Sequence, residues 1–318
     1  MSNSLHVAIC IVGFRNPDDI LRCFEALGRS THAEFHVVIC ENGGAEAARD
    51  LRARAPSALP GGQRVEVVTA PRNLGYAGGV NVCLAHGPKA DAWWILNPDT
   101  QPAPDALEQM VVRLAKGDRH AVGCTICTPD GEVESRGGHW RRWMARAVSL
   151  EHGVRLDAPF DGAALERRLS YLSGASMLVG RDFLKTAGIM REDYFLYGEE
   201  VEWCLRAQAR GLSLGVAPAA RVVHHQGSTT GSVSEIAGRS RTSVYLDERN
   251  KLLVTRDCFP ASLPVAAPAA LALIFLRFAR RGAWRQLGYA IDGWVAGLRN
   301  ARGAPAWITL GPDEDRRI

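Results

Sequence analysis

The first 100 residues alternate between short apolar segments and helical segments, and this alternation restricts the chain to few folds. The apolar segments, which we expect to be strands, cover residues 7–12, 35–40, 65–69 and 93–96. Helices are expected after the first three of them, at residues 17–27, 45–55 and 80–86. Strands that alternate with helices predict a mainly parallel sheet of buried strands. Such sheets bind ligands at the carboxyl ends of their strands, so a site is expected there.

The loops at those strand ends are rich in glycine, amide and acid. Their sequences are GFRN (13–16), ENGG (41–44), NLGYAGG (73–79) and NPDT (97–100). The glycines of NLGYAGG can let a diphosphate approach the backbone at a helix start, or they can simply form a turn. Their spacing is not G-x-G-x-x-G, which disfavours a nicotinamide-dependent dehydrogenase.

Asp99 follows a buried apolar segment directly, in WWILNPDT. Pro98 cannot continue a strand because it has no N–H to donate. An acid in this place can bind a divalent cation that bridges phosphate oxygens, since Mg²⁺ and Mn²⁺ prefer oxygen ligands. From these eight residues alone, a turn stabilised by the Asp99 side chain is the favoured alternative.

Three glutamates, Glu199, Glu200 and Glu202, occupy the first turn of a predicted helix that ends at Gly211. Acids in a first turn favourably oppose the helix dipole, which explains them without any function. They also lie beside Tyr194, Phe195, Tyr197 and Trp203. A carboxylate in an aromatic-walled pocket can have a raised pKa and act as a general base.

Beyond residue 100 the alternation weakens. We expect strands at residues 121–127 and 173–179, an antiparallel hairpin at 129–143 and a short helix at 181–187. A further apolar strand ends at His224-His225, before a glycine-rich segment. One histidine there could be a core or turn residue, whereas two are compatible with a ligand role.

Charge and composition exclude some classes of protein. The net charge is +4 and charged residues are 23%, which argues against a nucleic-acid binder. The first residues, MSNSLHVAICIVGF, lack a basic n-region and a cleavage site, so we expect a strand and a cytosolic protein. Cys124 and Cys127 form a CxxC without a second pair nearby, and buried thiols are expected there rather than zinc.

The composition changes again near residue 240. Residues 258–285 contain no acid, and an apolar run at 261–276 is interrupted by Pro264 and Pro268. Such a run is short for a membrane span, which needs about 20 apolar residues. Four arginines and the nearby Trp284, Tyr289 and Trp294 suit a helix that lies in a membrane interface. An ordinary helical tail packed on the domain is the equal alternative.

Seven segments carry a resemblance to a known family. They are AICIVGFRNPDDILRCFEAL, VVICENGG, PRNLGYAGGVN, WWILNPDT, YLSGASMLVGRDFLKTAGIM, YFLYGEEVEWCLRAQARG and APAARVVHHQGST. Their order over roughly residues 5–232 resembles the inverting family-2 glycosyltransferases, especially rhamnosyltransferase-like members of bacterial cell-surface polysaccharide assembly. No single segment is specific, but the seven in register are.

The resemblance implies an α/β fold of the GT-A type, which is a Rossmann-like, mixed and mainly parallel sheet flanked by helices, with a C-terminal helical extension. The GT-A domain would cover residues 1–239, with a nucleotide-sugar-binding half at 1–100 and an acceptor and catalytic half at 101–239. Residues 240–318 would form the helical, membrane-associating region.

The resemblance also implies a role for each candidate residue. Asp99 would hold Mn²⁺ or Mg²⁺ on the donor's diphosphate, with Asn97 in place of the first acid of the family's metal motif. His224 matches a second metal ligand, and Glu200 matches the catalytic base. Further donor-binding residues are Phe14, Arg15, Glu41, Asn73, Gly75 and Gly79, and acceptor-side residues are Glu199, Glu202 and Trp203.

Three departures from the family pattern bear on the identity of the donor more than on catalysis. Arg15 replaces a common asparagine, and Glu41 replaces an aspartate that reads the uracil or thymine base. The acidic cluster consists of glutamates alone, where the family usually has a Glu-Asp pair.

The implied function is inverting transfer of a sugar, with rhamnose a candidate, from a UDP- or dTDP-linked donor to a glycan or lipid-linked acceptor. The implied location is the cytoplasm, peripherally on the inner face of the cell membrane. One alternative is a catalytically degenerate nucleotide-sugar-binding protein. Another is a sugar-1-phosphate nucleotidyltransferase, for which GFRNPDD is a poor match to the expected phosphate loop. Residues 132–168 contain no motif that identifies the sugar or the acceptor.

Overall fold

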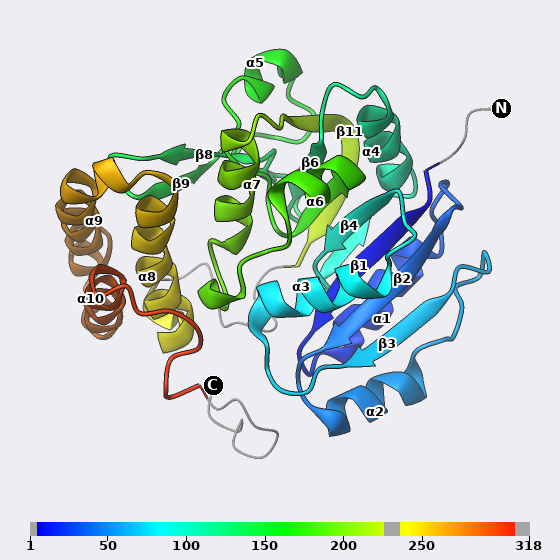
Figure 1. Ribbon diagram of the computed structural model, residues 1–318, viewed down its shortest axis with the longest axis horizontal. Coiled ribbons are helices and arrows are strands. Elements are labelled where there is room, and N and C mark those ends of the chain that lie inside the picture. Colours follow the sequence, from blue (N-terminus) through cyan, green and yellow to red (C-terminus); the bar gives the residue numbers. More distant parts are fainter. Residues whose placement is uncertain (1–4, 226–235, 309–318) are drawn as a thin grey trace.

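A computed structural model describes residues 5–225 and 236–308, and its centre is one mixed sheet (Figure 1). Four parallel neighbours come first: β3 (Val65–Thr69), β2 (Phe35–Glu41), β1 (Val7–Gly13) and β4 (Ala92–Leu96). The sheet continues through the antiparallel β10 (Ser176–Gly180) to β6 (Ala121–Cys127), then β11 (Leu214–His224) and β5 (Thr100–Pro102). The short β7 (Val133–Ser135) pairs with β6, so nine strands form the sheet in the described part of the chain.

Helices cover both faces of the sheet. On one face lie α1 (Pro17–Leu27), α2 (Ala45–Arg54) and α4 (Ala106–Ala115), which share an apolar core with Val7, Ile9 and Ile11 of β1. On the other lie α3 (Gly75–His86), α6 (Arg181–Ala187) and α7 (Glu199–Ala209), which share a second core with Ala8, Cys10 and Val12. Every residue of β1 is buried, since successive side chains point to opposite faces that are both covered. The expected buried, mainly parallel sheet is therefore confirmed.

Small elements surround this framework. They are the hairpin of β8 (Gly138–Arg141) and β9 (Arg146–Ser149), the helix α5 (Gly162–Glu166), and the 3₁₀ turns η1 (Glu192–Tyr194), η2 (Ile236–Gly238), η3 (Pro260–Ser262) and η4 (Ala279–Arg281). A hairpin was expected at residues 129–143, but the observed hairpin of β8 and β9 begins later in the chain. The reason is that β7, within the expected range, pairs with β6 instead of with β8.

Three further helices complete the described chain: α8 (Arg241–Cys258), α9 (Leu263–Phe278) and α10 (Trp284–Leu298). In Figure 1, α8 lies between α7 and the pair α9 and α10, and α8 contacts all three. Leu252 and Val254 of α8 belong to the same apolar core as Trp203 of α7. The expected helical extension is present, and it shares the core of the sheet domain.

Two helices differ from expectation. The helix α3 begins at Gly75, five residues before the expected start, so the glycines of NLGYAGG lie inside it. The helix α9 continues through Pro268, which the sequence treated as an interruption. Pro264 stands at the first turn of α9, where a missing N–H costs nothing.

Candidate functional site

One cavity collects most of the predicted site residues. It has a volume of about 480 Å³ and lies at the carboxyl ends of β1, β2 and β4. Phe14, Asn73, Gly75, Asn97, Asp99, Glu199, Glu200 and His224 all line it. A hollow of about 580 Å³ at the opposite edge, lined by His6 and His36, contains none of the predicted residues.

Asp99 and His224 meet in this cavity, as predicted from two separate strand ends. The Nε2 atom of His224 lies 3.3 Å from an oxygen of Asp99, and its Nδ1 atom lies 2.9 Å from an oxygen of Glu134. Burial disfavours the charged imidazole, but the hydrogen bonds to Asp99 and Glu134 outweigh burial and raise the pKa of His224 to about 10. The Gln226–Thr229 end of the histidine motif lies outside the described residues.

These side chains fit a divalent cation through the chemistry of their donor atoms. Carboxylate oxygens and the nitrogen of an imidazole that has lost its proton suit Mn²⁺, and carboxylates suit Mg²⁺. Asp99 and His224 each expose only 11% of their side chains, so water competes little with them. Within residues 5–225 and 236–308 no group of three ligand side chains is arranged for a metal, so the diphosphate would have to complete the coordination.

Glu199 and Glu200 face the same cavity from the first turn of α7. The residue before this helix, Gly198, has a left-handed backbone conformation. Burial, followed by repulsion from Glu200, raises the pKa of Glu199 to about 8. One oxygen of Glu199 is buried without a hydrogen-bond partner. Burial also raises the pKa of Glu200. Burial therefore disfavours the charged form of both carboxyl groups, and Glu199 is the more deeply buried of the two.

The loop before α7 packs directly on the glycine-rich turn. Gly75 has a φ of +71°, and a Cβ atom there would lie 2.1 Å from the carbonyl oxygen of Phe195. That carbonyl accepts a hydrogen bond of 2.7 Å from the N–H of Tyr76. Gly75 thus admits the backbone of the neighbouring loop at the start of α3, and it also lines the cavity, so both interpretations of NLGYAGG stay predictions.

Tyr76 also explains the residue in place of the first acid. Its hydroxyl lies within hydrogen-bond distance of two acceptors, the carbonyl of Gly174 at 2.7 Å and Asn97 Oδ1 at 3.0 Å. A Cβ atom at Gly174 would lie 3.5 Å from Cγ of Glu200. Asn97 thus anchors the tyrosine that, together with Gly174, borders Glu200.

The remaining donor-side candidates shape the cavity mostly from outside. Glu41 is 1% exposed, and its Oε1 atom accepts hydrogen bonds from the N–H groups of Arg15 and Gly43 at 3.1 and 2.7 Å. Arg15 adopts a left-handed conformation with φ of 54°. Neither Glu41 nor Arg15 lines the cavity. Phe14, which directly follows β1 in the chain, does line it. Asn42, which sequence reasoning missed, holds the turn by bonds to Gly75 O and Leu74 N.

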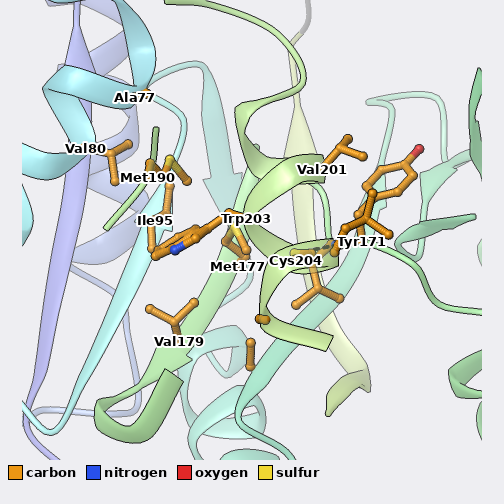
Figure 2. Packing of buried hydrophobic residues seen from close by; sticks show 14 of the residues in the cluster. Ala77, Val80, Ile95, Tyr171, Met177, Val179, Met190, Val201, Trp203 and Cys204 are labelled. Atoms are coloured by element: carbon orange, nitrogen blue, oxygen red, sulfur yellow. Dashed lines mark hydrogen bonds between the residues drawn. The ribbon is translucent and has the colours of Figure 1, made fainter. Parts of the chain in front are cut away.

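Three further predicted residues, like Arg15 and Glu41, do not line the cavity. Gly79 packs α3 on β1, since a Cβ atom there would lie 2.6 Å from Val12. Glu202 forms an ion pair of 2.8 Å with Arg206 on its own helix. Trp203 is fully buried among Ile95, Met177 and Val179 (Figure 2) and packs edge to face on Phe183. Residues of a helix are about 100° apart, so Glu202, two residues after Glu200, points to the opposite side of α7. Trp203 is kept out of the cavity by its burial in the core.

The comparisons with known proteins agree with this arrangement. The family model described as glycosyltransferase-like family 2 matches residues 5–243. The chain belongs to glycosyltransferase family 2. The predicted membership is thereby confirmed.

Two relatives of this glycosyltransferase are named as a hexosyltransferase and a rhamnosyltransferase. A low-salt glycan biosynthesis hexosyltransferase, Agl10, of Haloferax volcanii is 21% identical over 94% of this chain and 93% of its own. An N-acetylglucosaminyl-diphospho-decaprenol L-rhamnosyltransferase of Mycobacterium tuberculosis is 26% identical over 72% of this chain and 80% of its own.

Solved structures confirm the GT-A fold of the glycosyltransferase. A mannosyltransferase of Pyrobaculum calidifontis, in complex with GDP-Man and Mn²⁺, superposes with a TM-score of 0.56 at 14% identity. The match covers 94% of this chain and 88% of that one. Residues 1–349 of TarS of S. aureus, in complex with UDP-GlcNAc, give a TM-score of 0.56 at 11% identity over 93% and 92% of the two chains.

Several residues that line the cavity of the glycosyltransferase were not predicted from the sequence. Tyr76 and Asn42 lie within the quoted segments NLGYAGG and ENGG, and their place after a strand end could have identified them. Glu134 and Asp247 lie where no motif could be read. Asp247 reaches the cavity from α8, together with Arg239, Thr242 and Ser243 from the same region.

Proposed function

We propose that this enzyme transfers a hexosyl or deoxyhexosyl group, with rhamnose a candidate, from a nucleotide-diphosphate sugar to an acceptor hydroxyl with inversion at the anomeric carbon. One observation carries the proposal. The carboxylates of Glu199 and Glu200 line the same cavity as Asp99 and His224, so that a proton acceptor and a diphosphate-binding group can serve one substrate pair. A glycan or lipid-linked acceptor is supported by the names of both relatives.

The donor half of the cavity suits a nucleoside diphosphate. Asp99 and His224 would hold Mn²⁺ or Mg²⁺, with Glu134 orienting the imidazole from its other nitrogen. The bound cation would supply charge stabilisation to the departing diphosphate. Phe14 lines the wall beside the carboxyl ends of β1 and β2, where we place a uracil or thymine base, and Glu41 supports that loop from beneath. A UDP- or dTDP-linked sugar is therefore our candidate donor.

Glu200 supplies the base. Its carboxylate accepts the proton of the acceptor hydroxyl, and the hydroxyl oxygen forms a bond to the anomeric carbon. The bond from that carbon to the diphosphate oxygen breaks, and the electron pair leaves with the diphosphate. Attack from the side opposite the leaving group inverts the anomeric carbon. Protonated Glu199 keeps a second negative charge away from Glu200, which favours the ionised base.

A lipid-linked acceptor would be met at the inner face of the cell membrane, so we propose a peripheral location there. A second candidate function is that of a catalytically degenerate protein that only binds nucleotide sugars. It is favoured by Asn97, which stands in place of the first acid of the metal motif. Turnover separates the two functions.

A screen of nucleoside diphosphates and nucleotide sugars tests the proposal, first by thermal shift and then by release of nucleoside diphosphate. We expect a UDP or dTDP compound to raise the melting temperature in Mn²⁺ and not in EDTA, because a ligand of the folded state stabilises it by mass action. Asp99→Ala should lose this Mn²⁺-dependent shift, and Asp130→Ala, at an exposed turn, should keep it. Equal shifts in EDTA and Mn²⁺ would refute the metal assignment, and binding without turnover would support the degenerate alternative.

A further inference from the structure

The helix α9 has two different faces. Its inner face, with Ala266, Ala270, Ile274 and Phe278, is buried against the rest of the protein. Its outer face exposes large apolar side chains, with Val265 54% exposed, Phe275 46% and Leu276 50%. With the 3₁₀ turns at its ends the helix spans Pro260–Arg281, long and apolar enough to cross a membrane, and only 33% of its most apolar stretch is buried in the protein.

Positive charge flanks this outer face. Arg280, Arg281 and Arg285 are exposed just beyond the end of α9, beside Trp284, which is 67% exposed. No acid occurs between Asp257 and Asp292 in the sequence. Exposed apolar side chains next to arginine and tryptophan are typical of protein segments that lie in a membrane interface.

We infer that the α9 surface, which we define as Val265, Phe275, Leu276, Arg280, Arg281, Trp284 and Arg285, docks on an anionic lipid membrane. The inference deepens the proposed function, because it names the surface on which a lipid-linked acceptor is met. The apolar side chains enter the boundary between headgroups and acyl chains, and the arginines pair with anionic headgroups.

The charges argue against two other occupants. A second copy of the chain in a twofold dimer would bring arginines of the α9 surface close to their own equivalents, which repel each other. A transmembrane position would require α9 to leave α8. Arg277, near the end of α9, pairs with Glu248 of α8 at 3.3 Å, and the Glu248 side chain is only 5% exposed. Breaking this pair would leave the buried Glu248 with Lys251, at 2.9 Å, as its remaining ion-pair partner.

The α9 surface is also connected to the cavity. Asp247 lines the cavity from α8, and Arg277 of α9 lies 3.5 Å from Asp247 on the other side. A single ion-paired layer thus separates the docked helix from the acceptor end of the cavity. An acceptor held in the membrane would need to extend only past α8.

Co-sedimentation of the full chain with lipid vesicles tests the inference. Phosphatidylcholine vesicles with phosphatidylglycerol should bind the protein, and vesicles without it should bind less. Binding should weaken with salt, because exposed charges are screened beyond about 8 Å at physiological ionic strength. Phe275→Ser with Leu276→Ser, and separately Arg280→Glu with Arg281→Glu, should each lower binding by about tenfold or more.

Two matched controls use exposed side chains elsewhere. Val112→Ser with Ile189→Ser removes equally exposed apolar groups, and Arg29→Glu with Arg49→Glu reverses two exposed arginines. Both should bind like the unchanged protein, and all variants should keep their nucleotide thermal shift, which reports the proposed function separately. The inference is overturned by absent vesicle binding, by equal losses in the controls, by resistance to carbonate extraction, or by a dimer that the Phe275 and Leu276 substitutions dissociate.

Discussion

Adjacent residues of the cavity differ in chemistry because the fold buries them differently. Glu199 is 2% exposed with a partnerless carboxyl oxygen, whereas Glu200 is half-buried beside Tyr76 and Gly174. Since burial disfavours the charged form, Glu199 keeps its proton near neutral pH.

Glu199→Gln should therefore change how stability depends on pH. The folded protein keeps a proton on Glu199 up to about pH 8, and the unfolded chain releases it near the ordinary value of 4.5. The free energy of unfolding must then fall as the pH rises between these values, and glutamine removes this fall. Relative to the unchanged protein, the variant should gain stability from about pH 5 to about pH 8, by at most about 5 kcal/mol. Urea denaturation at both pH values measures this. A difference independent of pH, or the same gain in the exposed control Glu25→Gln, would contradict the assignment.

At this scale the sequence predicted the residues that follow strand and helix ends. Asp99, His224 and Glu200 could be found because a strand end or a helix start exposes them to the same edge of the sheet. Glu134 could not, because it reaches His224 through the short strand β7, which has no apolar period of its own.

Among the elements, α8 holds the loop that leads into α7. Asn250 is 1% exposed, and its side-chain amide donates to the carbonyls of Tyr194, Leu196 and Tyr197 at 3.0, 2.8 and 2.6 Å. Phe195 and Tyr197 have backbone φ angles of 69° and 72°, which residues other than glycine rarely adopt. These bonds offset the strain of a loop that lines the cavity.

Asn250→Leu should consequently lower both stability and turnover. The carbonyls of Leu196 and Tyr197 would lose this donor, while that of Tyr194 keeps a bond of 2.8 Å from Arg249, so the protein should be destabilised by roughly 2 kcal/mol or more. Relaxation of the loop should lower kcat by about tenfold through misplacement of α7. Thr255→Val is the matched control, because it removes a buried hydrogen bond within α8 that does not involve the loop. Thermal melts and steady-state kinetics distinguish the two variants, and unchanged kcat in Asn250→Leu would show that α8 does not position the site.

Most elements followed from apolar periodicity, and the exceptions have a tertiary cause. The helix α3 starts among glycines, which sequence reasoning assigns to turns, because the carbonyl of Phe195 caps it from a distant loop. The helix α9 continues past Pro268 because that proline lies on the exposed face, away from the packing that holds α9 in place. Neither the cap on α3 nor the exposed position of Pro268 can be predicted from the neighbouring residues in the sequence.

At the scale of the whole molecule, the C-terminal helices are part of the sheet domain. Leu252, Leu253 and Val254 of α8 share a core with Ala266 and Ala270 of α9 and with the buried side of α7. The domain boundary expected at residue 239 rests on a change of composition, and from the shared core we propose instead that α8 folds together with the sheet.

A chain that ends at residue 239 should accordingly fail to fold. Removal of α8 exposes the apolar core under α7 and releases the loop that Asn250 holds. We expect a 1–239 fragment to be insoluble or to melt without cooperativity, in a comparison with the full chain by calorimetry. A fragment that melts cooperatively near the temperature of the full chain, and binds nucleotide, would restore the boundary.

The central claim is that Glu200 is the base of a glycosyl transfer in this cavity, and Glu200→Gln tests it most directly. Glutamine keeps the shape and cannot accept the proton, so turnover should fall by about 10²-fold or more with donor affinity nearly unchanged. Glu202→Gln, outside the cavity, should keep its turnover. Near-normal turnover in Glu200→Gln, measured as nucleoside diphosphate released in the presence of acceptor, would contradict the account, and a loss confined to Glu199→Gln would move the base to that neighbour.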